Sequence, residues 1–242
     1  VGTATQTEVE EQVDLMYSLI HQQVDAIVLV PIDSKALVQP VVEAVRKGVP
    51  VINIDIRLDT QLLEQAGVEV AFVGPDNFAA AYEVGKLLDK KLRNEDKVAI
   101  IEGLAAADNA QQRKRGFIKA IEEKGLRLVA SEPADWETEK AAEVFQAMWM
   151  RYPDLKAVYC SNDAMALGVL QQMQEKNCYL PVVGFDNDAV MKEFLSTGKL
   201  VATADIFSSQ MAVRGIEFAL DVLEGKIENR GVHSTAYEII KQ

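Results

Sequence analysis

Two stretches of this chain decide its fold: YCSNDAMALG at residues 159–168 and VVGFDN at residues 182–187. Each is a short apolar run that stops at small polar and acidic residues, and the first continues into a helical pattern over residues 164–173. An apolar strand that leads into a helix is typical of open parallel α/β sheets. Because ligands of such sheets bind beyond the carboxyl ends of the strands, we expect Asn162, Asp163 and Asp186 to lie where a small polar molecule is held.

The same alternation of strand and helix runs along the whole chain. Strands are predicted at residues 25–30, 49–54, 71–73, 97–101, 127–131, 157–160, 182–185 and 201–204. Helices are predicted at residues 8–21, 36–46, 78–92, 109–124, 138–152, 164–175, 189–197 and 210–223. Residues 1–5 have the pattern of the end of a strand. Buried strands that alternate with helices of this length predict parallel α/β layers.

The composition is that of a globular protein with an acidic surface. Of the 242 residues, 49% are hydrophobic, and the mean hydropathy is +0.00. No apolar run reaches the roughly 18 residues that a membrane-spanning helix needs. The formal net charge of -12 repels phosphate backbones, so we expect no nucleic-acid binding by this segment.

Residues that often carry catalysis or bind metals are sparse. Cys160 and Cys178 are predicted at opposite edges of a parallel sheet, whereas a disulfide needs Cα atoms within about 7 Å. We therefore expect two free, mostly buried thiols, and neither has a Cys or His neighbour at zinc-ligand spacing. His21 and His233 are too far apart in the chain to indicate a metal site or a Ser-His-Asp triad. The sequence predicts no metal, no cofactor and no enzyme activity.

Strands that end in acidic or amide residues occur in both halves of the chain, which favours two sheets over one. Asp55 follows a strand in the first half, as Asn162 and Asp186 do in the second. Residues 74–77, Gly-Pro-Asp-Asn, form a turn-rich break before a new helix. We expect the chain to cross from one lobe to the other there, and to cross again near residues 205–208.

Several motifs in combination resemble the ribose/galactose-type sugar-binding proteins of bacterial ABC transporters. The resemblance covers residues 12–240, and the motifs are Pro31-Ile32-Asp33-Ser34, Asp76-Asn77, Arg113 with Gly116-Phe117, residues 162–168 and Gly184-Phe185-Asp186. It implies a periplasmic-binding-protein-like fold of type I, with two doubly wound parallel-sheet lobes joined by a hinge and a ligand cleft between them. The implied N-terminal lobe has residues 1–74 and 207–236, and the C-terminal lobe has residues 75–206 and 237–242.

The function that this resemblance implies is capture of a monosaccharide or related polyol and its delivery to a membrane ABC permease. Such a protein is expected to be a monomer in the periplasm, or a lipoprotein anchored outside the cytoplasmic membrane. Two alternatives share the fold: the ligand-sensing domain of a lac-repressor-type regulator and that of a membrane signalling receptor. Compared with the family, about one opening βα unit is missing from this sequence, and we expect the functional protein to contain it. We expect a chain extended by that unit to be more stable and to bind sugar more tightly.

Sugar recognition needs three kinds of group. Carboxylates accept hydrogen bonds from the sugar hydroxyls, Arg or Asn side chains donate to the hydroxyl oxygens, and aromatic rings pack on the apolar faces of the sugar. In the first half of the site, Asp55 ends a strand and Arg57 follows two residues later. Asp55 could instead cap a helix or lie in a surface turn. Asn109 could bind ligand or cap a helix. Arg113 holds the position typical of the family, but it could form a salt bridge instead.

The second half of the site follows the later strands. Trp136 lies where the family has a stacking aromatic residue, and the alternative is a contact in the core. Asn162 and Asp186 form the strongest pair of ligand-binding candidates, while Asp163 is expected to cap the following helix. Asp205 ends a strand and could replace the polar residue that the family has nearby.

Overall fold

The computed structural model describes residues 1–241, apart from the side chain of residue 89, and the chain divides into two compact units. Unit 1 has residues Val1–Pro75, Ala106–Asn109 and Phe207–Ala236, and unit 2 has Asp76–Ala105, Ala110–Ile206 and Tyr237–Gln242. The sequence analysis put the first boundary one residue earlier. It did not assign residues 106–109 to the same unit as the N-terminal residues.

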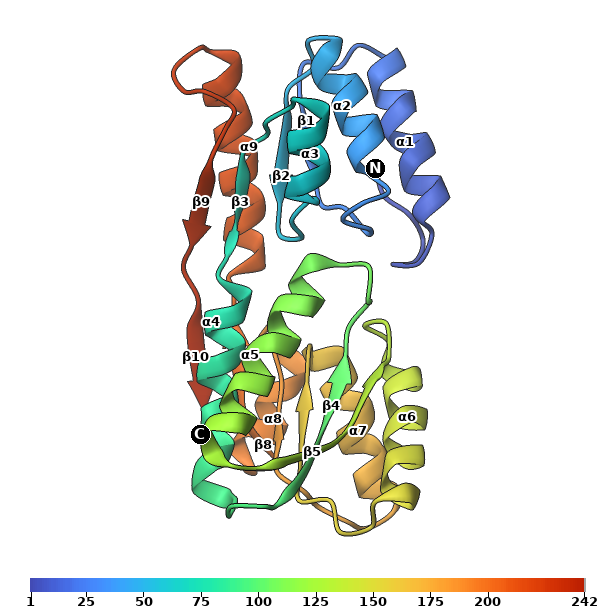
Figure 1. The fold of residues 1–242 in the computed structure, drawn as a ribbon, viewed down its shortest axis with the longest axis vertical. Helices are drawn as coiled ribbons and strands as arrows, with labels where there is room; N and C mark the ends of the chain where they lie inside the picture. Colours follow the sequence, from blue (N-terminus) through green and yellow to red (C-terminus); the bar gives the residue numbers. More distant parts are fainter. Residues whose placement is uncertain (242) are drawn as a thin grey trace. The chain divides into compact units, whose positions relative to one another are not determined.

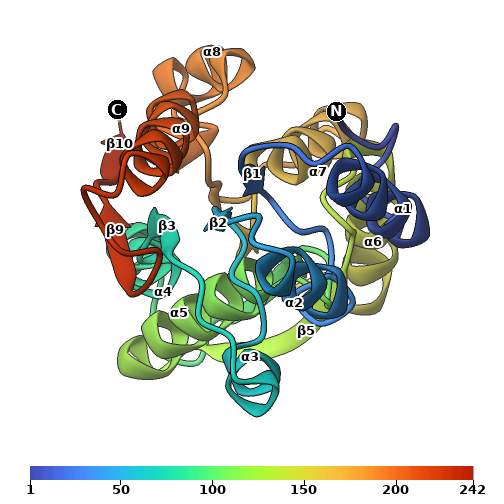
Figure 2. The same ribbon diagram turned by 90° about the horizontal axis from the view of Figure 1, so that it is seen from above.

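Unit 1 is a parallel sheet with helices on both faces (Figures 1 and 2). Its strand order is β1-β2-β3-β9, with β1 Ile27–Leu29, β2 Val51–Ile54, β3 Phe72–Pro75 and β9 Val232–Thr235. Its helices are α1 Val9–His21, α2 Val38–Arg46, α3 Thr60–Ala66 and α9 Ser208–Leu223. Alternate residues of the strands enter two cores: Ile27 and Val51 pack with α1 and α2, whereas Val28 and Ile52 pack with α9.

Unit 2 has a six-stranded sheet, in which β10 pairs antiparallel with β8 and all other pairs are parallel. The order is β10-β8-β7-β6-β4-β5, with β4 Lys97–Glu102, β5 Arg127–Pro133, β6 Ala157–Cys160, β7 Val182–Val183, β8 Leu200–Asp205 and β10 Glu238–Lys241. The helices are α4 Asn77–Gly85, η1 Lys86–Lys91, α5 Asp108–Lys124 (which begins in unit 1), α6 Thr138–Arg151, α7 Asp163–Glu175, η2 Ala189–Met191 and α8 Lys192–Ser196. Ile100, Phe117 and Tyr159 are fully buried in its core.

One expected secondary-structure element is absent, and two expected helices contain 3₁₀ turns. Residues 1–5 do not end a strand, because local contacts replace a ladder: Thr3 Oγ1 donates to the Thr5 carbonyl at 2.7 Å, and Thr5 N donates to Glu8 Oε2 at 2.8 Å. The expected helix at residues 78–92 changes from an α-helix to a 3₁₀-helix after Gly85. The expected helix at residues 189–197 likewise begins as a 3₁₀-helix before α8.

Three elements lie outside the predicted strand and helix ranges: α3, β9 and β10. Helix α3 is N-capped by Asp59, whose carboxylate accepts from Leu62 N at 3.0 Å, and it ends at Gly67 in the left-handed conformation with a φ of 66°. Strand β9 holds His233, which the sequence pattern placed in a loop, and it pairs with β3. Strand β9 completes the edge of the unit 1 sheet, and Leu63 of α3 joins the core that contains α1 and α2.

The two cysteines are free, as expected, although only one of them is fully buried. Cys160 is buried in β6, and Cys178 is partly exposed. Burial raises the pKa of both thiols, most strongly that of Cys160. Among the helices that the structure describes, none has the length and apolar character needed to cross a bilayer.

Close packing of α6 against α7 generates a prediction for Gly168. A Cβ atom at this position would lie 2.0 Å from the Thr138 carbonyl oxygen, so any side chain forces the two helices apart. We expect Gly168→Ala to lower the free energy of unfolding by about 1–3 kcal/mol, despite the higher helix propensity of alanine. Urea denaturation measures the change.

Gly2→Ala is the matched control, because a Cβ atom at Gly2 would have no heavy atom within 4 Å. It should leave stability within about 0.5 kcal/mol of the parent. Equal stability of Gly168→Ala and the parent would contradict the close helix contact.

Candidate functional site

The carboxyl ends of the unit 2 strands gather most of the predicted site residues. Trp136 follows β5, Asn162 follows β6, Asp186 follows β7 and Asp205 ends β8. These strands belong to one sheet, in which β4 separates β5 from β6, and all of them run parallel, so their carboxyl ends meet at one edge. This is the edge at which open α/β sheets bind ligands.

Arg113 on α5 is the buried centre of this edge. Its side chain is 3% exposed, its Nε donates to Asn77 Oδ1 at 2.9 Å, and its Nη1 donates to the Ser161 carbonyl at 2.8 Å. Nη1 also lies 3.4 Å from Asp186 Oδ1. The salt bridge that the sequence analysis offered as an alternative therefore exists. It fixes the arginine against the aspartate that the sequence selected for the ligand.

Two aromatic rings border the Arg113 guanidinium. Its central carbon lies 3.7 Å from the centroid of Phe185 and 5.5 Å from the centroid of Trp136. Trp136 is 8% exposed and packs on Gly103, where a Cβ atom would lie 2.1 Å from the ring. A cation over aromatic faces is a favourable electrostatic arrangement. Trp136 thus has core contacts and also lies beside the arginine, so stacking on a ligand stays a prediction.

Non-glycine residues in the left-handed backbone region lie just after the strands. In unit 2 they include Asp135 and Trp136 after β5, with φ of 50° and 70°, and Asp186 and Asn187 after β7, with φ of 109° and 59°. In unit 1, Asp55 directly after β2 has a φ of 63°. Such conformations are costly and often mark functional sites. Part of the backbone strain therefore falls on the segments that the sequence selected, whereas Gln23, Glu95 and Asn177 have positive φ before strands.

Asn162, and not Asp163, caps helix α7. The N-cap of α7 is Asn162, whose Oδ1 accepts from Met165 N at 2.9 Å, so its amide nitrogen is the part that can donate to a ligand. The expectation that Asp163 is the cap is wrong, because Asn162 has the extended backbone of a cap residue and Asp163 already lies in the first turn. Burial raises the pKa of the Asp163 carboxyl to about 7.

Asp205 contributes to the loop after β7. Its Oδ2 accepts from Asn187 Nδ2 at 2.9 Å, which ties the end of β8 to the residue that follows Asp186. Direct contact of Asp205 with a ligand stays a prediction.

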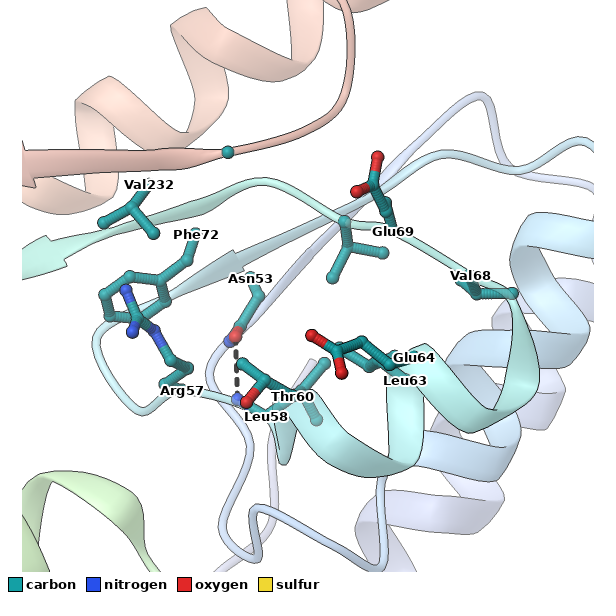
Figure 3. A pocket seen from close by; sticks show the side chains of 12 residues that line it. Asn53, Arg57, Leu58, Thr60, Leu63, Glu64, Val68, Glu69, Phe72 and Val232 are labelled. Carbon is teal, nitrogen blue, oxygen red and sulfur yellow. Dashed lines mark hydrogen bonds between the residues drawn. The ribbon is translucent and has the colours of Figure 1, made fainter.

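Asp55 and Arg57, two predicted site residues of unit 1, differ from each other in their surroundings. Asp55 is partly buried directly after β2, whereas Arg57 places its guanidinium carbon 4.4 Å from the Phe72 ring centroid. Figure 3 shows Arg57 beside Phe72 on the wall of a hollow of about 170 Å³ in unit 1. Asn53 in the same hollow is held by its own loop, since its Oδ1 accepts from Leu58 N at 2.9 Å. The Arg57 guanidinium therefore packs on the Phe72 ring within unit 1.

Asn109 is 5% exposed in the first turn of α5. Its Oδ1 is buried and has no hydrogen-bond partner among the residues that the structure describes. Asn109 follows the first helical residue, Asp108, so the position is not that of a cap. A buried amide oxygen without a partner is costly, which favours the ligand-binding interpretation over the capping one.

Sequence reasoning missed three residues that shape this site. Asn77 and Phe185 stood inside the quoted motifs but were given no role, and Ser161 contributes through its carbonyl oxygen. Asn77 and Phe185 each lie close to a strand end, and that position is the signal that could have selected them. Nothing in the sequence marks a backbone carbonyl. In the described part of the chain, no group of three His, Cys, Asp or Glu side chains is arranged to hold a metal ion.

Comparison with known proteins identifies the class. A family described as "Periplasmic binding protein domain" matches residues 1–227, and the chain belongs to this family. Its fold of two parallel α/β units is that of the type I members, which include sugar-binding proteins of ABC transporters.

Individual relatives are similar over nearly the whole chain. The D-ribose/D-allose-binding protein of Pseudomonas aeruginosa is 41% identical over 99% of this chain and 76% of its own length. A solved ABC-transporter solute-binding protein from Burkholderia multivorans has a TM-score of 0.95 and 39% identity, covering 100% of this chain and 86% of that one. Another from Actinobacillus succinogenes, with bound D-allose, has a TM-score of 0.90 and 32% identity, covering 97% and 82%. These relatives are solute-binding proteins and not enzymes.

The buried contacts of Arg113 generate a prediction about stability. Lysine has the same charge, but it lacks the planar guanidinium whose separate nitrogens donate to Asn77 and to the Ser161 carbonyl. We expect Arg113→Lys to lower the free energy of unfolding by about 1.5–3 kcal/mol, since hydrogen bonds from a buried cation are lost. Urea denaturation of the ligand-free protein measures it.

Arg115→Lys, at an exposed position on the same helix, is the control and should change stability by less than about 0.5 kcal/mol. If the two variants have the same stability, the Arg113 contacts do not hold unit 2 together.

Proposed function

We propose that this protein is an extracytoplasmic solute-binding protein that captures a monosaccharide or related polyol and delivers it to an ABC permease. The observation that supports it most is the arrangement around Arg113 at the carboxyl edge of the unit 2 sheet. There a fixed guanidinium, the Asp186 carboxylate and two aromatic rings come together from different elements.

Each of these groups matches one part of a sugar. The Asp186 carboxylate accepts from ring hydroxyls, and the Arg113 guanidinium donates to hydroxyl or ring oxygens. The face of Trp136 suits the C–H surface of a pyranose or furanose ring, while the fully buried Phe185 ring supports the Arg113 guanidinium. Asn162 donates through its amide nitrogen.

Three residues of unit 1 are also proposed as sugar-binding residues. The Asp55 carboxylate and the buried Asn109 oxygen supply acceptors for further hydroxyls. Arg57 is the weakest member of the proposed set, because its guanidinium already lies over Phe72. Asp205 is proposed to contribute together with Asn187, which it binds.

The proposed substrate class is an aldose or a related polyol. The D-ribose/D-allose-binding relative at 41% identity and the D-allose complex at 32% identity favour aldopentoses and aldohexoses. A periplasmic location and a permease partner are supported by the family name and the ABC-transporter relatives. A monomeric state is also proposed. A sensing domain on the same fold would bind the same sugars without a permease.

A thermal-shift screen of pentoses, hexoses and polyols tests the proposed function. D-Allose and D-ribose are the first probes, and xylitol and myo-inositol represent the polyols. A sugar at about 100 times its Kd stabilises the folded protein by roughly 2.7 kcal/mol, which is a clear rise in Tm. If no sugar or polyol changes the Tm, the proposed substrate class is wrong.

Removal of the Asp186 carboxylate tests its proposed contact with the sugar. A charged acceptor contributes roughly 1.5–3 kcal/mol to a hydrogen bond, so Asp186→Ala should weaken sugar binding at least tenfold in calorimetry. Asp154→Ala is the control, because Asp154 pairs with Lys97 at the surface and should leave affinity unchanged. An unchanged affinity in Asp186→Ala would remove this residue from the site.

Fluorescence tests the proposed stacking of Trp136. Its emission should shift when sugar binds, and Trp136→Ala should weaken affinity roughly tenfold by removing the ring face. The other tryptophan, Trp149 on α6, is the control, and Trp149→Phe should keep both the affinity and the spectral shift. If Trp136→Ala instead loses about 3–5 kcal/mol of stability and keeps its affinity, Trp136 is a core residue only.

A further inference from the structure

The Asp163 carboxylate is fully buried and holds the loop that carries Asp186. One carboxylate oxygen accepts from Thr203 Oγ1 at 2.9 Å, and the other accepts from Asp188 N at 2.8 Å. The backbone N of Asp163 donates to the Phe185 carbonyl at 2.7 Å. One residue of α7 therefore links the segment before Asp186, the segment after it and the neighbouring strand β8.

The Thr203 hydroxyl extends this link to the next residue of the loop. It accepts from Asn187 N at 3.2 Å while it donates to Asp163. Asp186 and Asn187 have left-handed φ angles of 109° and 59°, which are costly unless surrounding contacts fix them. The hydrogen bonds to Asp163 and Thr203 are placed to fix them.

Gly184 leaves the room that this contact requires. A Cβ atom at Gly184 would lie 2.0 Å from Asp163 Oδ1, so the carboxylate packs directly on the backbone after β7. A side chain at this position would push the Asp163 carboxylate away from the loop.

We propose that Asp163 is a positioning residue, whose carboxylate holds residues 186–188 in the conformation that presents Asp186 to the sugar. The inference rests on the proposed function, and Asp163 itself does not touch the ligand. The Thr203 hydroxyl helps to hold the same loop through its bonds to Asp163 and Asn187, and the lack of a side chain at Gly184 leaves space for the Asp163 carboxylate.

The charge state of Asp163 gives the proposal a distinctive signature. Both Asp163 carboxylate oxygens accept hydrogen bonds, which suits the ionised form because that form can only accept. Burial raises the pKa of Asp163 to about 7, and the charged and titratable groups around it are Asp188 in the loop, Cys160 on β6 and the Arg113–Asp186 pair beyond. Because the pKa is raised, the organising form is present above about pH 7 and is lost as the pH falls through that value.

Calorimetry with D-allose and D-ribose tests the proposal in the whole chain. The parent should lose about tenfold or more in affinity between about pH 8 and about pH 5.5. Asp163→Asn should bind about tenfold more weakly at pH 8, and its affinity should change little with pH. Thr203→Val keeps the shape of the side chain and should weaken binding in the same direction. Asp154→Asn, at the surface, should match the parent in affinity and in pH profile.

The outcomes separate this inference from the proposed function. If the parent binds sugar and Asp163→Asn keeps its affinity and pH profile, Asp163 does not position the loop. Where Asp163→Asn does not fold, Thr203→Val decides, and parental affinity in that variant overturns the inference. The proposed function is contradicted instead if the parent binds no sugar, or if the Asp186→Ala variant binds sugar as tightly as the parent.

Discussion

The burial of one guanidinium group is the constraint on which unit 2 depends. A buried cation without partners is very unfavourable, so Arg113 requires the Asn77 amide, the Ser161 carbonyl and the Asp186 carboxylate around it. These partners come from α4, the end of β6 and the end of β7. Satisfying one charge therefore fixes the relative positions of three chain segments at the carboxyl edge of the sheet.

Strain and buried polar groups are concentrated at the same edge. The segments after β5 and β7 have left-handed residues, and the neighbouring Asp163 carboxyl has a raised pKa because burial disfavours its charge. Stability alone would favour apolar or glycine residues at such positions. The left-handed residues and the buried carboxyl lower stability, but they hold the polar side chains of this edge in fixed positions before a ligand binds.

The sequence predicted the parallel architecture because apolar runs followed by helices are local features. It also selected Arg113, Trp136 and Asp186, which the structure brings together. It did not predict α3, which is only seven residues long, or β9, whose residues are mostly exposed. The capping of α7 by Asn162 instead of Asp163 depends on a backbone angle, and the position of Arg57 depends on Phe72 in β3. Such features arise from tertiary contacts that no local pattern records.

The pairing of β3 with β9 has a consequence for the order in which the protein is made. Asn229 just before β9 accepts from Ala71 N, a residue 158 positions earlier, and donates to the Val51 carbonyl. During synthesis, strands β4 to β8 emerge in one continuous stretch and can form most of unit 2. The N-terminal strands meanwhile wait for α9 and β9. The N-terminal part of unit 1, which is synthesised first, therefore stays incomplete until almost the whole chain has emerged, and its apolar strands are exposed in the nascent chain during that time.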